Sequence, residues 1–247
     1  MSEAPDFSPL AGSYARARPG YPAALFSWLA QRLERRELAW DAATGNGQAA
    51  LGLAGHFERV VATDRSAEQI ARAVPHPRVD YRVAAAESSG LDDASVDLVT
   101  VAAALHWFDH PAFFEEVRRV VRPGGAFAAW SYHAGRVEAP FDEVFDRFYW
   151  GLVKPYFASG ADHVDVRYET IAMPGEPIPA PEFAISVEWT LQQLLDYVGS
   201  WSAVASYRAA TGEDPADRIR GELERIFAEQ GERLTVRMPL FLHFRRL

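Results

Sequence analysis

Between residues 38 and 131, short apolar runs alternate with amphipathic segments, and this alternation is the feature that most constrains the fold. The apolar runs are short and often rich in Val, which predicts buried strands. Amphipathic segments between such strands act as crossover helices, so the pattern predicts a parallel sheet. The predicted strands are 38–42, 59–63, 79–83, 96–102 and 126–131. The predicted helices are 47–56, 66–73 with Ser66 as the cap, and 111–121.

The second half of the chain is less regular. We expect an aromatic-rich amphipathic helix over 141–153 and a proline-rich loop over 173–181. Two further helical segments are predicted at 189–210, with a break at Gly199, and at 215–230, with Asp214 as its cap. Residues 233–245 read as a final strand, in which Pro239 indicates an edge position or a bulge.

Composition narrows the range of partners. A formal net charge of −9 disfavours binding to nucleic acid or to anionic lipid, and no local basic patch offsets it. The chain has no cysteine, which excludes disulfides, thiolate metal sites and cysteine nucleophiles. No signal-peptide pattern is seen at the N-terminus, so we expect a cytoplasmic protein. His106, Asp109 and His110 lie close together in the sequence. Loop residues at this spacing are more often polar surface residues than metal ligands, so no metal is expected.

The stretch Asp-Ala-Ala-Thr-Gly-Asn-Gly-Gln at 41–48 joins a predicted strand to a predicted helix. Gly45 and Gly47 allow a sharp turn and a close approach of the backbone to a ligand. The helix that follows presents free N–H groups to an anion. Asp64 ends the next strand, where a carboxylate can accept hydrogen bonds from a ribose diol. Together these features favour a ligand that contains adenosine.

Six stretches carry a resemblance that covers nearly the whole chain: 14–22, 41–48, 62–66, 97–100 with 104–108, 122–125 and 201–207. In this order and spacing they resemble the type 11 group of class I S-adenosylmethionine-dependent methyltransferases. The branch that includes trans-aconitate methyltransferases is particularly similar. The resemblance implies S-adenosyl-L-methionine as the cofactor and a small molecule as the methyl acceptor.

The resemblance also implies a set of cofactor-binding positions. They are Asp41, Ala43, Gly45, Gly47, Gln48, Asp64, Arg65, Ala86, Glu87, Ala102, Ala103 and Trp107. Within this set, Asp64 would bind the ribose hydroxyls. Ala86 and Glu87 would lie beside the adenine, and Ala102 and Ala103 under the ribose and sulfonium.

The candidate catalytic residues are His106, Tyr14 and Arg18. His106 follows a central strand and would stand near the transferred methyl, either as a general base or as a residue that shapes its loop. Tyr14 and Arg18 belong to a segment that the resemblance implies is a lid. Arg18 would bind a substrate carboxylate or form a surface salt bridge, and Arg208 is a second candidate for the carboxylate.

Aromatic side chains could also face the sulfonium. Tyr14 and Trp107 are candidates for this wall, whereas the helical spacing of Trp150 and Trp201 favours packing in the core.

Two positions depart from the family pattern. Ala43 replaces the first glycine of the turn, and a right-handed or extended backbone there would accommodate its methyl group. Ala85 replaces an aspartate that many relatives carry, so the adenine amino group would need a backbone carbonyl or Glu87 as its acceptor.

We therefore expect an α/β, doubly wound, Rossmann-like fold with a seven-stranded, mostly parallel sheet whose last strand is antiparallel. Residues 1–37 would form a lid and leading helix, 38–131 the cofactor-binding core, and 132–247 a helical cap with the final strands. The expected function is methyl transfer to a small molecule, with a carboxylate as the first candidate. Two alternatives stay open: a non-catalytic cofactor-binding partner protein, and an NAD(P)-dependent oxidoreductase, since Ala50 permits the looser Gly-x-Gly-x-x-Ala form. The sequence does not fix the oligomeric state.

Overall fold

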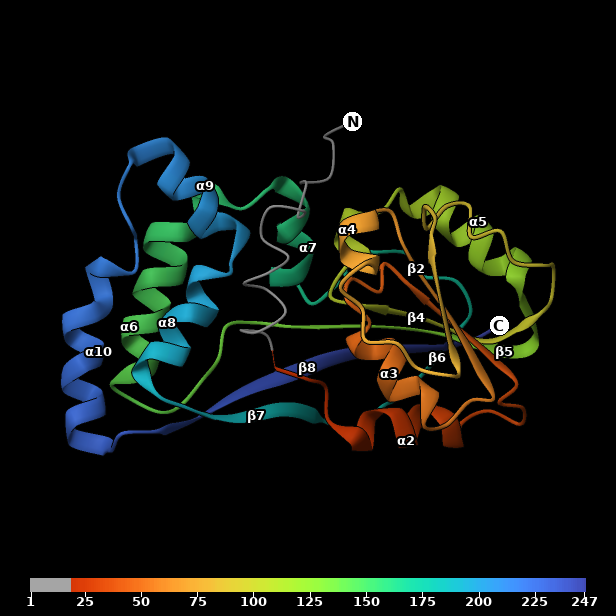
Figure 1. Cartoon of the computed structure of the whole chain (residues 1–247), viewed down its shortest axis with the longest axis horizontal. Coiled ribbons are helices and arrows are strands. Elements are labelled where there is room, and N and C mark those ends of the chain that lie inside the picture. The colour runs from red at the N-terminus through yellow and green to blue at the C-terminus, as the bar shows by residue number, and fades with distance from the viewer. Residues whose placement is uncertain (1–18) are drawn as a thin grey trace.

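A computed structural model describes residues 19–247 and shows a sheet flanked by helices, with a second group of helices beyond one end (Figure 1). The strands are β1 (Leu38–Ala42), β2 (Arg59–Asp64), β3 (Val79–Val83), β4 (Val96–Ala102), β5 (Val121–Tyr132), β6 (Glu176–Ile178), β7 (Phe183–Trp189) and β8 (Leu234–Arg246). The helices around the sheet are α2 (Ala23–Gln31), α3 (Gln48–Ala54), α4 (Ala67–Ile70) and α5 (His110–Val120). The second group contains α6 (Phe141–Phe148), α7 (Asp162–Asp165), α8 (Leu191–Gly199), α9 (Ser202–Thr211) and α10 (Asp217–Gln230). Short helical turns are η2 (Leu105–Trp107), η3 (Tyr149–Val153), η4 (Lys154–Tyr156) and η5 (Ser159–Ala161).

The sheet order is β3-β2-β1-β4-β5-β8-β6, with β7 also paired to β8. Neighbours among β1 to β5 are parallel, whereas β8 runs antiparallel to β5. The order reverses between β1 and β4, which is the switch point at which doubly wound sheets bind ligands. The expected fold class and antiparallel last strand are confirmed, although the sheet has eight strands and not seven.

Both faces of the parallel strands β1, β2, β4 and β5 are largely buried, whereas the edge strand β3 is only partly buried. Trp40 and Val61 point to the face that α5 covers, and Ala39 and Val60 point to the face that α2 and α3 cover. Figure 1 shows α5 on one side of the sheet and α2 and α3 on the other. A strand that is buried on both faces reads as a continuous apolar run, which is why β4 was recognisable from sequence.

The differences from expectation lie mainly in the second half. Strand β7 was not predicted, and Trp189 belongs to it and not to the following helix. Strand β6 lies within the predicted loop 173–181. Both strands pair only with β8, so they depend on a partner distant in sequence. The helix predicted over 141–153 gives way at Tyr149 to a π-helical turn. Strand β5 begins at Val121 and not at residue 126 as predicted, and its pairing with β4 shifts register in this added part.

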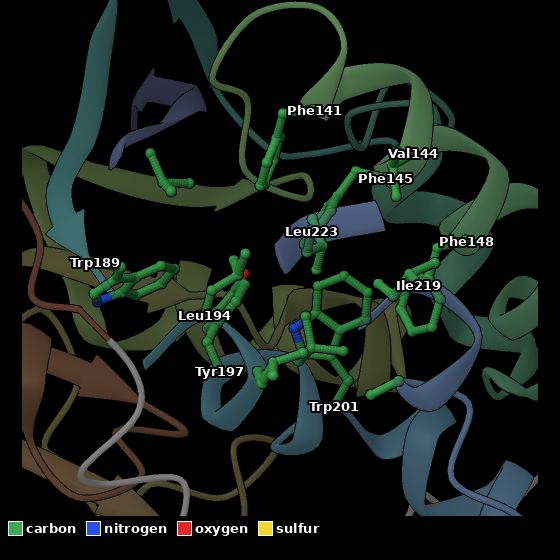
Figure 2. Close-up of a cluster of buried hydrophobic side chains, with 14 of the residues drawn as sticks. Phe141, Val144, Phe145, Phe148, Trp189, Leu194, Tyr197, Trp201, Ile219 and Leu223 are labelled. Carbon is green, nitrogen blue, oxygen red and sulfur yellow. The ribbon is translucent and has the colours of Figure 1, made fainter. Parts of the chain in front are cut away.

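The second group of helices, which we call the cap, has its own apolar core. Figure 2 shows Phe145, Phe148 and Trp201 converging with Tyr197 and Trp189 inside it. The rings of Phe145 and Trp201 pack edge to face at 6.2 Å. This geometry favours aromatic pairs beyond the area that they bury.

One ion pair holds the amino-terminal edge of the parallel sheet. The Asp97 carboxylate, at the start of β4, accepts hydrogen bonds from the main-chain N–H groups of Glu37 (2.7 Å) and Leu38 (3.0 Å). Its other oxygen lies 3.0 Å from Nη1 of Arg122, and the Asp97 side chain is 3% exposed. Two of the motifs that carried the family resemblance, at 97–100 and 122–125, therefore stabilise the fold at the edge opposite the carboxyl ends of the strands.

The substitution Asp97→Ala is expected to lower the free energy of unfolding by about 3 kcal/mol or more, because it leaves two main-chain N–H groups without their acceptor and removes the buried partner of Arg122, which keeps only Glu37 and the Ser95 carbonyl. The matched control is Asp80→Ala. The Asp80 carboxylate also binds two arginines, Arg59 and Arg82, but it is 39% exposed, so its loss should cost less than about 1 kcal/mol. Denaturant unfolding of the three proteins measures both changes. Equal losses in the two variants would contradict this account.

Candidate active site

A cavity of about 470 Å³ lies at the carboxyl ends of the parallel strands, under the cap. Its sheet side is formed by the residues that follow the strands: 43–46, 64–66, 84–87, 102–104 and 131–134. Its cap side is formed by Tyr149, Phe157, Ala161, Val164, Tyr197 and residues 200–202. The size is within the range of small-molecule sites.

Asp64, at the end of β2, is oriented by the backbone around it. Its Oδ2 accepts a hydrogen bond from Gly45 N (2.8 Å), and its Oδ1 accepts one from Ser66 N (2.9 Å). Each carboxylate oxygen has capacity for a further donor, so Asp64 can accept from the two hydroxyls of a ribose. Gly45 has φ +58°, and a Cβ there would meet no atom within 4 Å. The glycine turn is thus open toward the cavity, as binding of an adenosine cofactor requires.

The backbone at Ala43 corrects one expectation from sequence. Ala43 has φ 52° and Ala103 has φ 54°, so both lie in the left-handed region and neither is right-handed or extended. This conformation costs an L-residue roughly 1–2 kcal/mol. The cause at Ala43 is the turn itself, since Thr44 N must reach the carbonyl of Thr63 on β2 (2.9 Å). Both alanines line the cavity.

Asp41 and Gly47 do not line the cavity. Asp41 is fully buried beneath the turn and accepts hydrogen bonds from the hydroxyls of Thr44 (2.6 Å) and Thr100 (2.7 Å). Burial raises the pKa of Asp41 to about 6 despite these two donors. Asp41 thereby joins the glycine turn to β4. Gly47 has φ 91° and packs against the ring of Tyr81, leaving no room for a Cβ.

The segment after β3 lines the cavity with Ala85, Ala86 and Glu87. Glu87 Oε1 accepts a long hydrogen bond from Asp109 N, at 3.3 Å. The segment is fixed just downstream, where Glu116 of α5 accepts hydrogen bonds from the main chain and hydroxyl of Ser89.

His106 and Trp107 stand on η2, directly after β4, and both line the cavity. His106 Nδ1 lies 2.8 Å from the hydroxyl oxygen of Tyr168, and its ring lies 4.4 Å from that of Trp107. Burial lowers the pKa of His106 to about 3, with smaller contributions from His163 and His110. At neutral pH the imidazole is therefore uncharged.

The cap contributes a polar group of its own. Tyr149 Oη donates a hydrogen bond to Asp165 Oδ1 (2.9 Å), and Lys154 pairs with Asp165 and Asp162. Burial raises the pKa of Tyr149, and the Asp165 charge adds to this shift. Tyr149 thus remains protonated, with its proton directed to Asp165.

The cavity brings together most of the residues predicted from sequence. Those that line it are Ala43, Gly45, Gln48, Asp64, Arg65, Ala86, Glu87, Ala102, Ala103, His106 and Trp107. Trp201, for which packing in the core was expected, is buried in the cap and also borders the cavity. Tyr14 and Arg18 lie outside the described residues. Arg208, the second candidate for a carboxylate, does not line the cavity and pairs with Asp214. Trp150 is half-exposed and also does not line the cavity.

Sequence reasoning missed the residues that reach the cavity from the end of β5 and from the cap. Ser131 ends the strand predicted over 126–131 and His133 follows it, so their position at its carboxyl end was a usable signal. Tyr149 begins the π-helical turn η3 inside the predicted helix, and the sequence does not indicate that this turn faces the cavity. Tyr168 does not line the cavity but contacts His106 from an irregular segment. Among residues 19–247, no cluster of three or more His, Asp or Glu side chains could hold a metal ion. In the same range, no helix is long and apolar enough to cross a membrane.

The fold and the site define a protein that binds an adenosine-type ligand at the carboxyl edge of a parallel sheet. A methyltransferase domain model matches residues 40–129. A protein of Dictyostelium discoideum described as a methyltransferase is 30% identical over 243 residues, which cover 96% of this chain and 92% of that protein. An uncharacterised methyltransferase of Mycobacterium tuberculosis is 33% identical over 229 residues, covering 87% and 84%.

A solved structure from Anaeromyxobacter dehalogenans, described as a type II methyltransferase, is 43% identical with a TM-score of 0.86, and the match covers 93% of this chain and 97% of that one. The chain therefore belongs to the class I S-adenosylmethionine-dependent methyltransferases. It is an enzyme whose methyl donor is S-adenosyl-L-methionine, which favours this function over the two alternatives considered from sequence.

The strain at Ala43 can be tested directly. Ala43→Gly is expected to stabilise the protein by about 1 kcal/mol, because glycine adopts a positive φ without a steric cost. For a chain of this size the melting temperature should rise by ~2–4 °C. The matched control, Ala49→Gly in the buried face of α3, should destabilise the protein, since glycine is costly inside a helix. A melting temperature that falls in both variants would contradict the assignment of strain to Ala43.

Proposed function

We propose that the enzyme methylates a carboxylate group of a small molecule. One observation carries the proposal: among the described residues, the acceptor side of the cavity has no group basic enough to remove a proton, since burial lowers the pKa of both histidines that line it, His106 and His133. Asp64 and Glu87, the carboxylates of the described lining, follow β2 and β3 on the side assigned to the cofactor. His106 has a pKa lowered to about 3, and Tyr149 directs its proton to Asp165. A carboxylate acceptor needs no such base, because it is already ionised at neutral pH.

On the cofactor side, the residues present fit S-adenosyl-L-methionine. Asp64 would accept hydrogen bonds from the ribose hydroxyls, and the open turn at Gly45 would lie against the methionine part. Ala102 and Ala103 would lie under the ribose and sulfonium, and Glu87 would lie beside the adenine. The bound cofactor supplies a methyl group that its sulfonium has already activated, so the main task of the protein is alignment in a dry cavity.

On the acceptor side, the cavity is walled by Phe157, Tyr197 and Trp201 from the cap and by Trp107 from the sheet. These rings suit an acceptor with an apolar body. Three neutral polar groups could hold the carboxylate. They are the hydroxyls of Ser200 and Ser202 and the imidazole of His106. Arg18, outside the described residues, remains the proposed cationic partner. The similarity to trans-aconitate methyltransferases supports the same acceptor class.

The cofactor assignment predicts that Asp64→Ala loses about tenfold or more in affinity for both S-adenosylmethionine and S-adenosylhomocysteine. The reason is the loss of hydrogen bonds to a charged acceptor, each of which is typically worth about 1.5–3 kcal/mol. Calorimetric titration measures the change, with NAD as a control ligand and circular dichroism to show that the variant folds. The control variant Asp80→Ala removes an exposed carboxylate from the neighbouring strand and should bind normally. Unchanged affinity in Asp64→Ala would contradict the assignment.

The acceptor proposal predicts turnover with small carboxylic acids and none with their primary amides, measured as S-adenosylhomocysteine formed. Because the acceptor carboxylate titrates near pH 4 and His106 stays neutral, kcat/KM should be flat between about pH 6 and 8. Arg18→Ala should raise KM for the acid at least tenfold while leaving the affinity for the cofactor unchanged. Methylation of phenols or amines in place of the acids, with an activity that rises with pH, would overturn the proposal.

A further inference from the structure

We propose that Tyr168 is a positioning residue that fixes the protonation of His106, so that Nδ1 accepts the phenol proton and Nε2 presents its N–H to the methyl acceptor. His106 would then be a neutral hydrogen-bond donor to the acceptor and not a general base. This inference rests on the proposed function, since it needs an acceptor that binds beside His106. Nothing in the sequence pointed to Tyr168, which follows α7 in an irregular stretch of the cap.

The surroundings of the Tyr168 hydroxyl indicate the direction of the contact. His106 Nδ1 lies 2.8 Å from the oxygen, and Ser131 and the main chain of His106 oppose the rise in the phenol pKa that burial causes. A phenol has one proton to donate and two lone pairs. Tyr168 is fully buried and burial raises its pKa, so the phenol keeps its proton, and Nδ1 of the neutral imidazole is the acceptor within hydrogen-bond distance. This arrangement also pairs a strong O–H donor with the imidazole nitrogen, which is a better acceptor than a serine oxygen.

The backbone that positions Tyr168 is strained. Arg167 and Tyr168 have φ 53° and 62°, so two successive residues other than glycine are left-handed. Such strain persists only where the surroundings over-determine it. Here Tyr168 N donates to the carbonyl of His163 (2.7 Å), and the buried ring packs edge to face on Phe241 at 5.1 Å. The fully buried hydroxyl is thereby fixed on His106.

The η2 segment is held on its other side as well. Gly160 of η5 lies so close that a Cβ there would stand 2.4 Å from the carbonyl oxygen of His106. The charged or titratable groups that act on the imidazole are His110 on α5 and His163 on α7, and both oppose a positive charge. Together with burial, they keep the ring neutral. The second nitrogen, Nε2, has no hydrogen-bond partner among the described residues, and His106 lines the cavity. Nε2 is therefore the atom available to a ligand.

The first test is ¹⁵N NMR of the histidine side chains in the full chain, with His106 assigned by comparison with His106→Gln. The expected wild-type signal is the tautomer protonated at Nε2, unchanged between about pH 5 and 8. Tyr168→Phe keeps the ring and removes the hydroxyl, so His106 should then show exchange between both tautomers. The control Tyr207→Phe changes another buried tyrosine of the cap, one that does not line the cavity, and should leave the His106 signal unchanged.

A wild-type His106 protonated at Nδ1 would overturn the inference, and so would a tautomer unchanged by Tyr168→Phe. Because this readout needs no methyl acceptor, it stands apart from the success or failure of the proposed function. Should Tyr168→Phe not fold, the wild-type spectrum alone decides.

Turnover of a carboxylic acid then separates donor from base. The side chain of His106→Gln can donate a hydrogen bond but cannot remove a proton, so we expect kcat/KM within about tenfold of wild type. His106→Ala should lose roughly 10–100-fold, which corresponds to one hydrogen bond to a charged acceptor. Equal losses in the two variants, with a rise in activity near the pKa of an imidazole in wild type, would show that His106 is a base.

Discussion

A single long strand, β8, holds the two halves of the structure together. Its carboxyl-terminal part, from Leu240 to Arg246, pairs with β5 and closes the parallel sheet. Its amino-terminal part, from Leu234 to Leu240, pairs with β7. The side chains of Leu234, Val236 and Met238 enter the core of the cap. Since one strand is shared, the cap is fixed over the carboxyl ends of the parallel strands, and the cavity between them has a defined width.

This arrangement explains which parts of the fold could be predicted from sequence. Strands β1, β3 and β4 were predicted to the residue. In β1 and β4, burial on both faces gives a largely apolar run that needs no knowledge of the partner. The partly buried edge strand β3 shows the apolar–polar alternation of a half-buried strand. Strands β6 and β7 form only against β8 and were missed. Pro239 was interpreted as an edge or bulge signal. It lies just outside the pairing with β5, which ends at Leu240, while β7 continues past it.

The residues of the candidate site likewise divide into those that could be predicted from the sequence and those that could not. Gly45 and Asp64 belong to a local strand–turn–helix unit, and the sequence alone indicated both the residues and the reason for them. Ala43 was recognised as unusual, but its left-handed backbone depends on the reach of Thr44 to β2 and is not visible in the sequence. Tyr149 and Tyr168 come from the cap, whose path over the sheet is set by β8. A cap residue could therefore not be assigned to the cavity before the fold was known.

Most of the strained backbone among the described residues lies at the candidate site. Five described residues other than glycine have a positive φ: Ala43, Ala94, Ala103, Arg167 and Tyr168. Four of them border the cavity or deliver the Tyr168 hydroxyl to His106, and each costs of order 1–3 kcal/mol. The doubly buried sheet is the part of the molecule that can offset this cost. Its parallel strands contribute rigidity at one wall, and the strained cap segment contributes a neutral polar group at the other. Under the proposed function, a cavity built in this way would align a donor that is already reactive with an acceptor that is already ionised, which is the task that methyl transfer to a carboxylate requires.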